Sequence, residues 1–279
     1  MIPALTDETY CCGGRKMKIT SLLENTTERE DLRVEHGLSL YIETESHRIL
    51  FDMGQTELFY ENAKALGIDL SKVDIAILSH GHYDHGGGLR KFFEINSHAP
   101  VYIHRDAFLP HYNRAEKYIG LDTALKDHPQ IIFTNDECRV ADSLTLFSCN
   151  AKEKKHPTIP SGLTEKVGDS FVPDDFRHEQ YLLIRENEKQ ILISGCSHKG
   201  ILDITEWFKP DILIGGFHYS KRPLNEALAD AAKALAAHQT AFYTCHCTGR
   251  EQYEFMRQYM PLLHYLSCGQ TILINKGDT

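Results

Sequence analysis

The sequence predicts an α/β fold in which two β-sheets pack together and helices cover the outside. Three observations support this prediction. Short apolar or alternating segments typical of strands recur along the chain, stretches with apolar residues at helical spacing follow several of them, and the second half repeats the strand and helix order of the first. Two sheets that share a core and carry helices on their outer faces explain this order.

The first half predicts paired strands, a helix, a buried strand and then further strands. The signals are period-two alternation, apolar residues at helical spacing that end at a glycine, and short continuous apolar runs. Regular structure is expected to begin at Met17. The expected strands cover residues 38–42, 49–51, 73–79, 100–104, 130–133 and 144–148, and the expected helix covers residues 57–66.

The second half predicts a hairpin followed by alternating helices and strands. Its clearest element is an alanine-rich helix in which Leu228 and Leu235 share one face, so both are expected in the core. The expected strands cover residues 180–185, 190–194, 211–215 and 240–244, and the expected helices cover residues 200–208 and 224–237.

The length of 279 residues fits one large domain. Residues 1–16 hold a Pro, a Cys-Cys pair and a Gly-Gly pair without strand or helix periodicity, so we expect an N-terminal extension followed by a single domain over residues 17–279. The longest expected loop covers residues 150–175, which are rich in Pro, Gly, Ser, Lys and Asp. Long loops in compact domains are often lids or binding loops.

Composition argues against several classes of protein. The formal charge of −9 and the pI near 6.0 offer no overall positive field for nucleic acid. Neither a membrane-spanning apolar stretch nor a secretion-signal pattern is present, and eight scattered cysteines indicate reduced thiols rather than a disulfide framework. We therefore expect a cytoplasmic protein that acts on a small molecule, without nucleic acid or membrane as a partner.

The segment most informative about chemistry is SHGHYDHGGG at residues 79–88. Four ligand-type side chains fall within six residues directly after an apolar strand, and the glycines let the backbone turn tightly. His80 and His82 can reach one cation, while Asp84 and His85 can reach another nearby. This arrangement predicts a two-metal site rather than a histidine-rich surface loop.

These four residues match the H-x-H-x-D-H signature of the metallo-β-lactamase superfamily, and the chain resembles that superfamily from Met17 onward. Further matching segments resemble the branch of dihydropterin-ribofuranosyl-aminobenzene phosphate synthase-like proteins. The resemblance implies a four-layer αββα sandwich with two metal ions at one edge. The segments that resemble the branch are Glu24-Asn25, Gly195-Cys-Ser-His198, Gly215-Gly-Phe-His218 and Cys245-His-Cys-Thr-Gly249, while Phe51-Asp-Met-Gly54 resembles the strand-ending Asp-x-Gly of the superfamily.

The resemblance also suggests the remaining ligands. His246 takes the place of the superfamily's last histidine, and Cys196 stands where the superfamily commonly has a metal-bridging aspartate. Cys196 is either a thiolate ligand or a buried structural thiol. Two histidines compete for the third position of the first metal, and we prefer His198, in its glycine-rich turn at a strand end, over His178.

Several nearby residues have open roles. His218 ends a strand and is expected to donate a proton or contact substrate, with strand capping as the alternative. Asp52 either orients a metal-bound histidine or forms a turn. Tyr83 is expected to pack beside the metal loop. Cys245 and Cys247 are expected to be packed reduced thiols.

The expected activity is hydrolysis of a small-molecule ester or phosphoester by a hydroxide that two metal ions activate. Asp84 holds the second metal and can receive a proton, while His218 protonates the leaving group. Zinc is the first expectation for both metals, with iron or manganese as alternatives.

Two other functions stay open: a transferase of the synthase type named above, and a metal-bearing ligand sensor without turnover. Substrate specificity is expected to depend on residues 150–176 and on residues 104–114, which include His111, Tyr112 and Arg114. The sequence predicts no oligomeric state.

Overall fold

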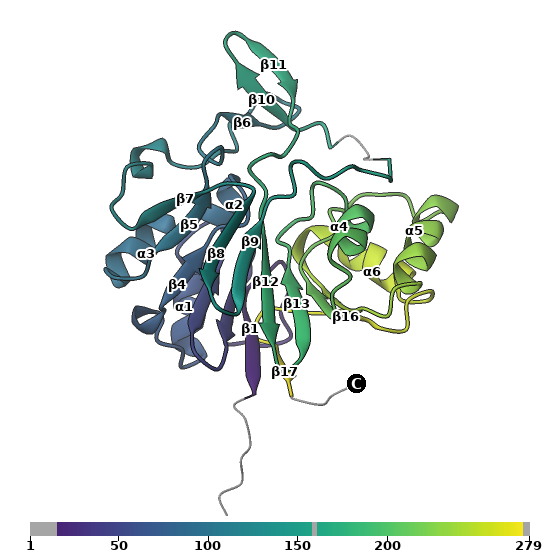
Figure 1. The fold of residues 1–279 in the computed structure, drawn as a ribbon, viewed down its shortest axis with the longest axis horizontal. Coiled ribbons are helices and arrows are strands. Elements are labelled where there is room, and N and C mark those ends of the chain that lie inside the picture. Colours follow the sequence, from purple (N-terminus) through teal and green to yellow (C-terminus); the bar gives the residue numbers. More distant parts are fainter. Residues whose placement is uncertain (1–15, 158–160, 276–279) are drawn as a thin grey trace, which may run out of the picture.

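Two seven-stranded sheets form the centre of the protein in a computed structural model that describes residues 16–157 and 161–275 (Figure 1). The expected N-terminal extension therefore lies outside the described residues, apart from Lys16. The strand order of the first sheet is β17-β1-β2-β3-β4-β5-β7. Its strands are β1 Met17–Leu23, β2 Ser39–Glu43, β3 Arg48–Phe51, β4 Ile75–Ile77, β5 Val101–His104, β7 Ile131–Thr134 and β17 Thr271–Ile274.

The second sheet has the order β16-β15-β14-β13-β12-β9-β8. In each sheet one half is antiparallel and the other half is parallel, namely β3 through β7 in the first sheet and β13 through β16 in the second. The strands of the second sheet are β8 Glu137–Ala141, β9 Leu144–Phe147, β12 Tyr181–Glu186, β13 Lys189–Ile193, β14 Ile212–Ile214, β15 Ala241–Thr244 and β16 Leu263–Tyr265.

The two sheets share one hydrophobic core. In β2, Leu40 and Ile42 join the cluster between the sheets, whereas Tyr41 points to the opposite face and joins the cluster beneath the first-half helices. This division follows from the two-residue period of a strand. From the second sheet, Leu182 and Ile193 enter the same central cluster. Each sheet is therefore buried on both faces.

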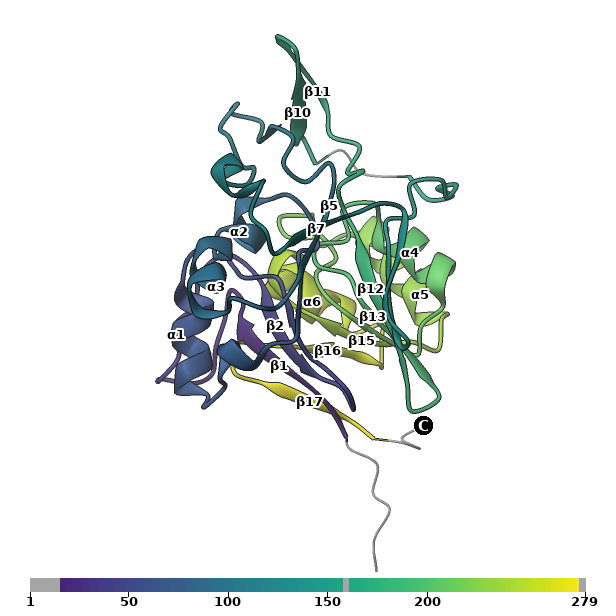
Figure 2. The same cartoon turned by 60° about the vertical axis from the view of Figure 1, so that its left-hand side comes forward.

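Helices cover the two outer faces. Figure 1 shows α1 and α3 outside the first sheet and α4, α5 and α6 outside the second, and Figure 2 shows the same layers from another side. The mixed α/β fold, with sheets flanked by helices, confirms the predicted αββα sandwich. The helices are α1 Leu58–Ala65, α2 Tyr83–Gly86, α3 Leu89–Ile95, α4 Ile201–Phe208, α5 Glu226–Ala236 and α6 Arg250–Met256, with 3₁₀ turns at Leu70–Lys72, Thr123–Leu125 and His246–Thr248.

Helix α5 shows how the sequence specifies an outer helix. The side chain of Asn225 accepts a hydrogen bond from the backbone N–H of Leu228 and caps the N-terminus. Leu228, Ala232 and Leu235 recur at helical spacing and are buried in the core between the helices and the second sheet. The predicted core positions of Leu228 and Leu235 are confirmed.

The expected long loop at residues 150–175 contains a hairpin instead. Strands β10 Thr164–Val167 and β11 Ser170–Pro173 pair with each other, and β10 pairs with β6 His111–Tyr112 to form a third sheet that projects at the top of Figure 1. All four residues of β11 are exposed. Because this strand buries neither face, it lacks the apolar alternation by which strands are recognised in a sequence.

The glycines after the histidine motif also have a different role from the one expected. The motif forms the short helix α2 and leads into α3, rather than an open loop. A Cβ atom on Gly87 would collide with the carbonyl of Gln55, and one on Gly88 with the carbonyl of Met53. These glycines therefore permit close packing of the backbone against the segment that follows β3.

Strands and helices after residue 244 were not predicted, and they include α6, β16 and β17. Strand β17 pairs antiparallel with β1 and completes the edge of the first sheet. No helix among the described residues is both long and apolar enough to cross a membrane. The single-domain assignment of residues 17–279 stays a prediction.

Candidate metal centre

The predicted ligand residues lie at the ends of parallel strands in both sheets. The histidine motif follows β4, while His198, His218 and His246 follow β13, β14 and β15, respectively. The carboxyl ends of adjacent parallel strands meet at the same edge of a sheet, where α/β proteins build their sites. The packing of the two sheets then brings the two halves of the chain together at this edge.

A first ligand cluster consists of His80, His82 and His198, all buried. The Nε2 atoms of His80 and His198 are 3.3 Å apart. Two ligand nitrogens of a tetrahedral zinc ion, each at roughly 2.0–2.1 Å, lie about 3.3–3.4 Å apart. The separation therefore suits a shared cation.

A second ligand cluster lies beside the first and involves Asp84, His85, His246 and Cys196. Oδ2 of Asp84 is 3.5 Å from Nε2 of His246 and 3.8 Å from Nε2 of His85. The Sγ atom of Cys196 is 3.2 Å from Nε2 of His85. Cys196 shares one potential ligand group with His80 and His85 and another with His246, so it lies between the two clusters.

Hydrogen bonds determine which nitrogen of His80 and His85 faces the clusters. Asp52 is fully buried, and its Oδ2 accepts from Ser79 Oγ and from His85 Nδ1, both at 2.7 Å. Because the Ser79 proton goes to Asp52, Ser79 Oγ accepts from Nδ1 of His80 at 2.8 Å. Nε2 of both histidines thus faces the clusters, and Asp52 contacts His85 directly and His80 through Ser79.

His246 is oriented in the same way by the N-terminal strand. Its Nδ1 lies 2.8 Å from Oδ1 of Asn25, which can only accept, and its backbone N–H donates to Glu24. The Nε2 atom therefore faces Asp84. Glu24 and Asn25 were noted only through family resemblance, and the structure places them directly behind His246.

Glu179 positions His198, and sequence reasoning did not identify it. Its carboxylate accepts the backbone N–H groups of His198 at 2.7 Å and Lys199 at 3.0 Å, and the hydroxyl of Tyr181 at 2.6 Å. The same turn needs Gly195, because a Cβ atom there would lie 2.6 Å from Ser79. No sequence motif marks this contact, which forms only when the turn after β13 folds over the segment that precedes β12.

His178, the alternative ligand of the first metal, is placed differently from His198. Its Nδ1 accepts the backbone N–H of Gly81 at 2.9 Å, and its Nε2 lies 3.3 Å from Oδ2 of Asp174. Both ring nitrogens are therefore committed to hydrogen bonds. Nδ1 of His198 is buried and has no hydrogen-bond partner within the part of the chain that the structure describes, and Phe176 stacks on its ring at a centroid distance of 4.4 Å.

His218 is half-buried, and its ring centroid lies 4.3 Å from that of His198. Burial, followed by the positive charge of Arg222, lowers the pKa of His218 to about 4. The ring is therefore neutral at pH 7 and suits hydrogen bonding to substrate. Its expected role as a proton donor stays a prediction.

Electrostatics favour neutral rings for His80 and His198 and an ionised Asp84. Burial, reinforced by the charges of neighbouring histidines, lowers the pKa of His80 and His198 well below the usual value. Burial would raise the pKa of Asp84, but the charge of His85 and hydrogen bonds from His246 and His36 outweigh it and keep the pKa well below the usual value. Neutral imidazole and carboxylate are the protonation states that bind metals.

Four ring nitrogens in this region are buried and lack a hydrogen-bond partner among the described residues: Nε2 of His82, His111 and His246, and Nδ1 of His198. His246 Nε2 approaches Asp84 only at 3.5 Å. Buried polar atoms in folded proteins are almost always satisfied. Among these four atoms, Nε2 of His246 faces the second cluster, and together with the close Nε2 pair of His80 and His198 it fits divalent cations. His111 was predicted only as part of a specificity segment.

His36 was also missed by sequence reasoning. Its Nε2 lies 3.3 Å from Oδ2 of Asp84, and its side chain is 56% exposed, so it marks the open side of the second cluster.

Among the other expectations, Cys245 is a buried free thiol in the core, and Cys247 is a free thiol whose Sγ contacts the carbonyl of Cys196. Tyr83 is half-buried at the start of α2.

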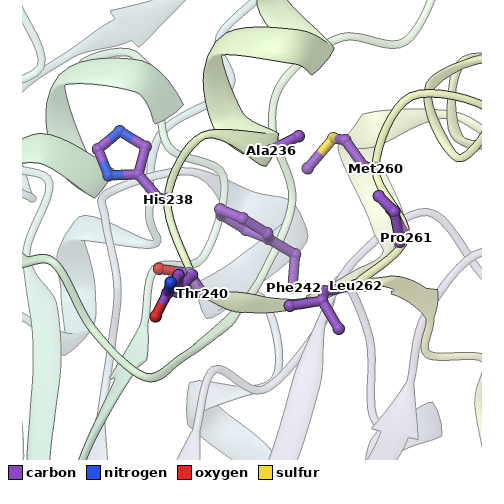
Figure 3. A pocket seen from close by; sticks show the side chains of 8 residues that line it. Ala236, His238, Thr240, Phe242, Met260, Pro261 and Leu262 are labelled. Atoms are coloured by element: carbon purple, nitrogen blue, oxygen red, sulfur yellow. The ribbon is translucent and has the colours of Figure 1, made fainter.

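A separate apolar cavity of about 270 Å³ lies between α5 and the ends of β15 and β16 (Figure 3). Its lining includes Ala236, Phe242 and Met260. None of its lining residues belongs to the ligand clusters. The apolar cavity and the ligand clusters therefore lie in different parts of the protein. We take the ligand clusters as the candidate site because they contain the side chains that can bind metal.

Fold and site together define the class of the protein: an αββα sandwich with a candidate metal centre at the edge where both sheets end. A sequence model described as the metallo-beta-lactamase superfamily matches residues 32–237, and the chain belongs to that superfamily. The family resemblance seen in the sequence is thereby confirmed.

The chain is also similar to individual proteins over most of its length. A 7,8-dihydropterin-6-methyl-4-(beta-D-ribofuranosyl)-aminobenzene-5'-phosphate synthase of Methanocaldococcus jannaschii is 32% identical over 266 residues, covering 85% of this chain and 90% of that protein. An uncharacterised protein of the same organism is 31% identical over 209 residues, covering 72% and 78%. A crystal structure described as a metal-dependent hydrolase of the beta-lactamase superfamily has a TM-score of 0.79 and 26% identity, covering 93% of this chain and 99% of that one.

Proposed function

We propose that the chain is a metal-dependent hydrolase that acts on a small-molecule ester or phosphoester with two divalent cations. The observation that carries this proposal is the convergence of buried ligand-type atoms at one edge of the sheets: one atom each of His80, His82 and His198 lies within 4.8 Å of the others, and so does one atom each of Cys196, His246 and Cys247. A crystallised relative described as a metal-dependent hydrolase supports it.

The chain's own residues divide into two ligand sets. His80, His82 and His198 would hold one cation, and the contacts of Asp84 with His85 and His246 and of Cys196 with His85 make these four residues the set that would hold the other. When bound, a pair of cations lowers the pKa of water toward about 7 and polarises a carbonyl or phosphoryl oxygen. We propose zinc for both positions, with iron or manganese as alternatives.

The surrounding residues orient the ligands and face the substrate. Asp52 fixes the ring of His85 and Asn25 fixes the ring of His246, so the donor atoms are held in place before a cation arrives. His218 stands beside His198, which supports a role for its side chain at the leaving group. Free cysteines among the described residues support a cytoplasmic location.

A second candidate function is transfer rather than hydrolysis. It is favoured by the relative named as a dihydropterin-ribofuranosyl-aminobenzene phosphate synthase, with 32% identity over most of both chains. In this alternative the cations would assist a leaving group, and a second organic substrate would replace water.

The deciding experiment uses zinc-loaded protein with a panel of phosphoesters, lactones and thioesters in ¹⁸O-labelled water. Hydrolysis predicts turnover of a single substrate, with one labelled oxygen in the product. Turnover that requires a second organic substrate and leaves the product unlabelled would favour the transferase. Metal and ligand binding without any product would favour a sensor. His82→Ala and Asp84→Ala should lose metal and turnover together, whereas His128→Ala, on a ring stacked against Phe93, should lose neither.

A further inference from the structure

His82, a member of the first ligand cluster, lies beside another buried histidine, His111. Nε2 of His82 and Nε2 of His111 are both buried, and neither has a hydrogen-bond partner among the described residues. The two ring centroids are 5.7 Å apart, and the ring planes are nearly perpendicular at 77°. A buried nitrogen without a partner carries a free-energy cost, so two neighbouring ones suggest that each serves the other.

Asp174 determines which nitrogen of His111 is available. Oδ2 of Asp174 lies 2.8 Å from Nδ1 of His111, and both side chains are fully buried. Burial would raise the pKa of Asp174, but hydrogen bonds from His111 and His178 outweigh it and keep the pKa well below the usual value. The carboxylate therefore accepts, and Nδ1 carries the proton. In the neutral ring Nε2 then keeps its lone pair and can only accept.

His178 has no nitrogen left to accept a hydrogen bond as His111 does. Its Nδ1 accepts the backbone N–H of Gly81, so its proton is on Nε2 and is directed to Asp174. His178 thereby joins the metal loop to Asp174. His111 is the member of this group that has an unused acceptor, and His82 is the neighbouring ligand that has an unused nitrogen.

We propose that His111 and Asp174 position His82. In this arrangement, which rests on the proposed metal site, His82 binds the first cation through Nδ1, and its Nε2–H donates to Nε2 of His111. The Nδ1–H of His111 in turn donates to Asp174, giving a carboxylate–imidazole–imidazole chain that ends at the metal ligand. Partners of this kind fix the tautomer of a ligating histidine and raise its basicity.

In this arrangement the third sheet brings His111 and Asp174 to the first ligand cluster. His111 lies on β6, and Asp174 directly follows β11, so the hairpin in residues 164–173 connects the two residues. Oδ1 of Asp174 accepts the backbone N–H of Phe176, the residue whose ring stacks on His198. The segment expected to be a loop thus reaches two of the three histidines of the first cluster, His82 and His198.

The test is a zinc titration of the metal-free full-length chain against a chromophoric chelator. His111→Asn keeps an amide N–H that can reach Asp174 but has no atom at the Nε2 position, so it should weaken one of two zinc equivalents by about 10–100-fold without changing the stoichiometry. His111→Gln places an amide oxygen near the Nε2 position and should recover most of the affinity. Asp174→Asn should weaken the same equivalent, and adding it to His111→Asn should cost little more. His128→Asn is the matched control.

A second readout needs no variant. In the ¹⁵N-histidine spectrum of the zinc-loaded wild type, Nε2 of His82 should be protonated and Nε2 of His111 unprotonated. Loss of a whole zinc equivalent in His111→Asn would make His111 a ligand and overturn the proposal, and so would unchanged zinc affinity or the opposite protonation pattern. A wild-type chain that binds no zinc would instead overturn the proposed function, and this inference with it.

Discussion

The Sγ atom of Cys196 lies 3.2 Å from Nε2 of His85, at the position where family resemblance suggests a metal-bridging aspartate. Cys196 also shares a potential ligand group with His246, so a sulfur stands between the two clusters. Thiolate is a softer ligand than carboxylate and favours zinc over manganese. This substitution gives the site a metal preference that can be measured.

Replacing Cys196 by Ser should lower zinc affinity more than manganese affinity. We expect zinc to bind at least about 10-fold more weakly, because a Zn–thiolate contact is lost, while manganese changes less. Cys196→Asp should shift the preference further toward manganese. Competition titrations with both metals measure the effect, and Cys138→Ser, on a half-buried free cysteine in β8, is the control. Equal losses for both metals would show that the sulfur is not a ligand.

Zinc affinity should increase with pH through the same thiol. Burial raises the pKa of Cys196 well above its usual value in the metal-free protein, so the thiol is protonated at pH 7. Binding as a thiolate must then release that proton, and affinity should rise by up to about tenfold per pH unit from this group. The slope of log affinity against pH between 6 and 8 should be smaller by about one in Cys196→Ser. An identical slope in both proteins would contradict the assignment.

The sequence predicted the part of the site whose residues lie close together along the chain. His80, His82, Asp84 and His85 lie within six residues, and the strand before them directs them to one edge. His246 and Cys196 could be proposed because each follows a strand that ends at the same edge and because the family pattern places ligands there.

The other residues of the site could not be predicted because they depend on contacts between segments that are distant in the sequence. His111 and Asp174 are 63 residues apart, and Glu179 and His198 are 19 apart. These pairs meet only when the third sheet and the turn after β13 fold over the metal loop. The strand β11 that leads to Asp174 is exposed along its length, so it has no apolar pattern to reveal it.

Asp52→Asn should destabilise the metal-free protein most at low pH. Burial lowers the pKa of His85, but the charges of Asp52 and Asp84 outweigh it and raise the pKa to about 9. The folded pKa is thus above the unfolded value of roughly 6.5, and the resulting stabilisation is complete below pH ~6.5 and lost as pH rises through ~9. Its full size is on the order of 3 kcal/mol.

Urea denaturation with a chelator at pH 6 and pH 9.5 measures this difference. The gap between wild type and Asp52→Asn should shrink at the higher pH. Asp69→Asn, on an exposed aspartate that accepts from Ser71, should show no comparable trend. A gap of constant size at both pH values would mean that the charge of His85 contributes nothing to folding.

Glu179→Ala should lower both the free energy of unfolding and zinc affinity. The carboxylate accepts the backbone N–H groups of His198 and Lys199, and their loss leaves buried donors unsatisfied beside the Lys199 ammonium. Each buried donor left without a partner costs about 1–3 kcal/mol. The turn that holds His198 also loses its anchor, so the zinc equivalent of the first cluster should bind more weakly.

Tyr181→Phe separates the two effects of Glu179. It removes only the hydroxyl that donates to the carboxylate at 2.6 Å, which should cost about 1 kcal/mol and leave zinc affinity unchanged because the His198 turn is still anchored. Denaturant unfolding and chelator competition on both variants provide the comparison. If Glu179→Ala were destabilised but bound both zinc equivalents as tightly as the wild type, Glu179 would support the fold without positioning His198.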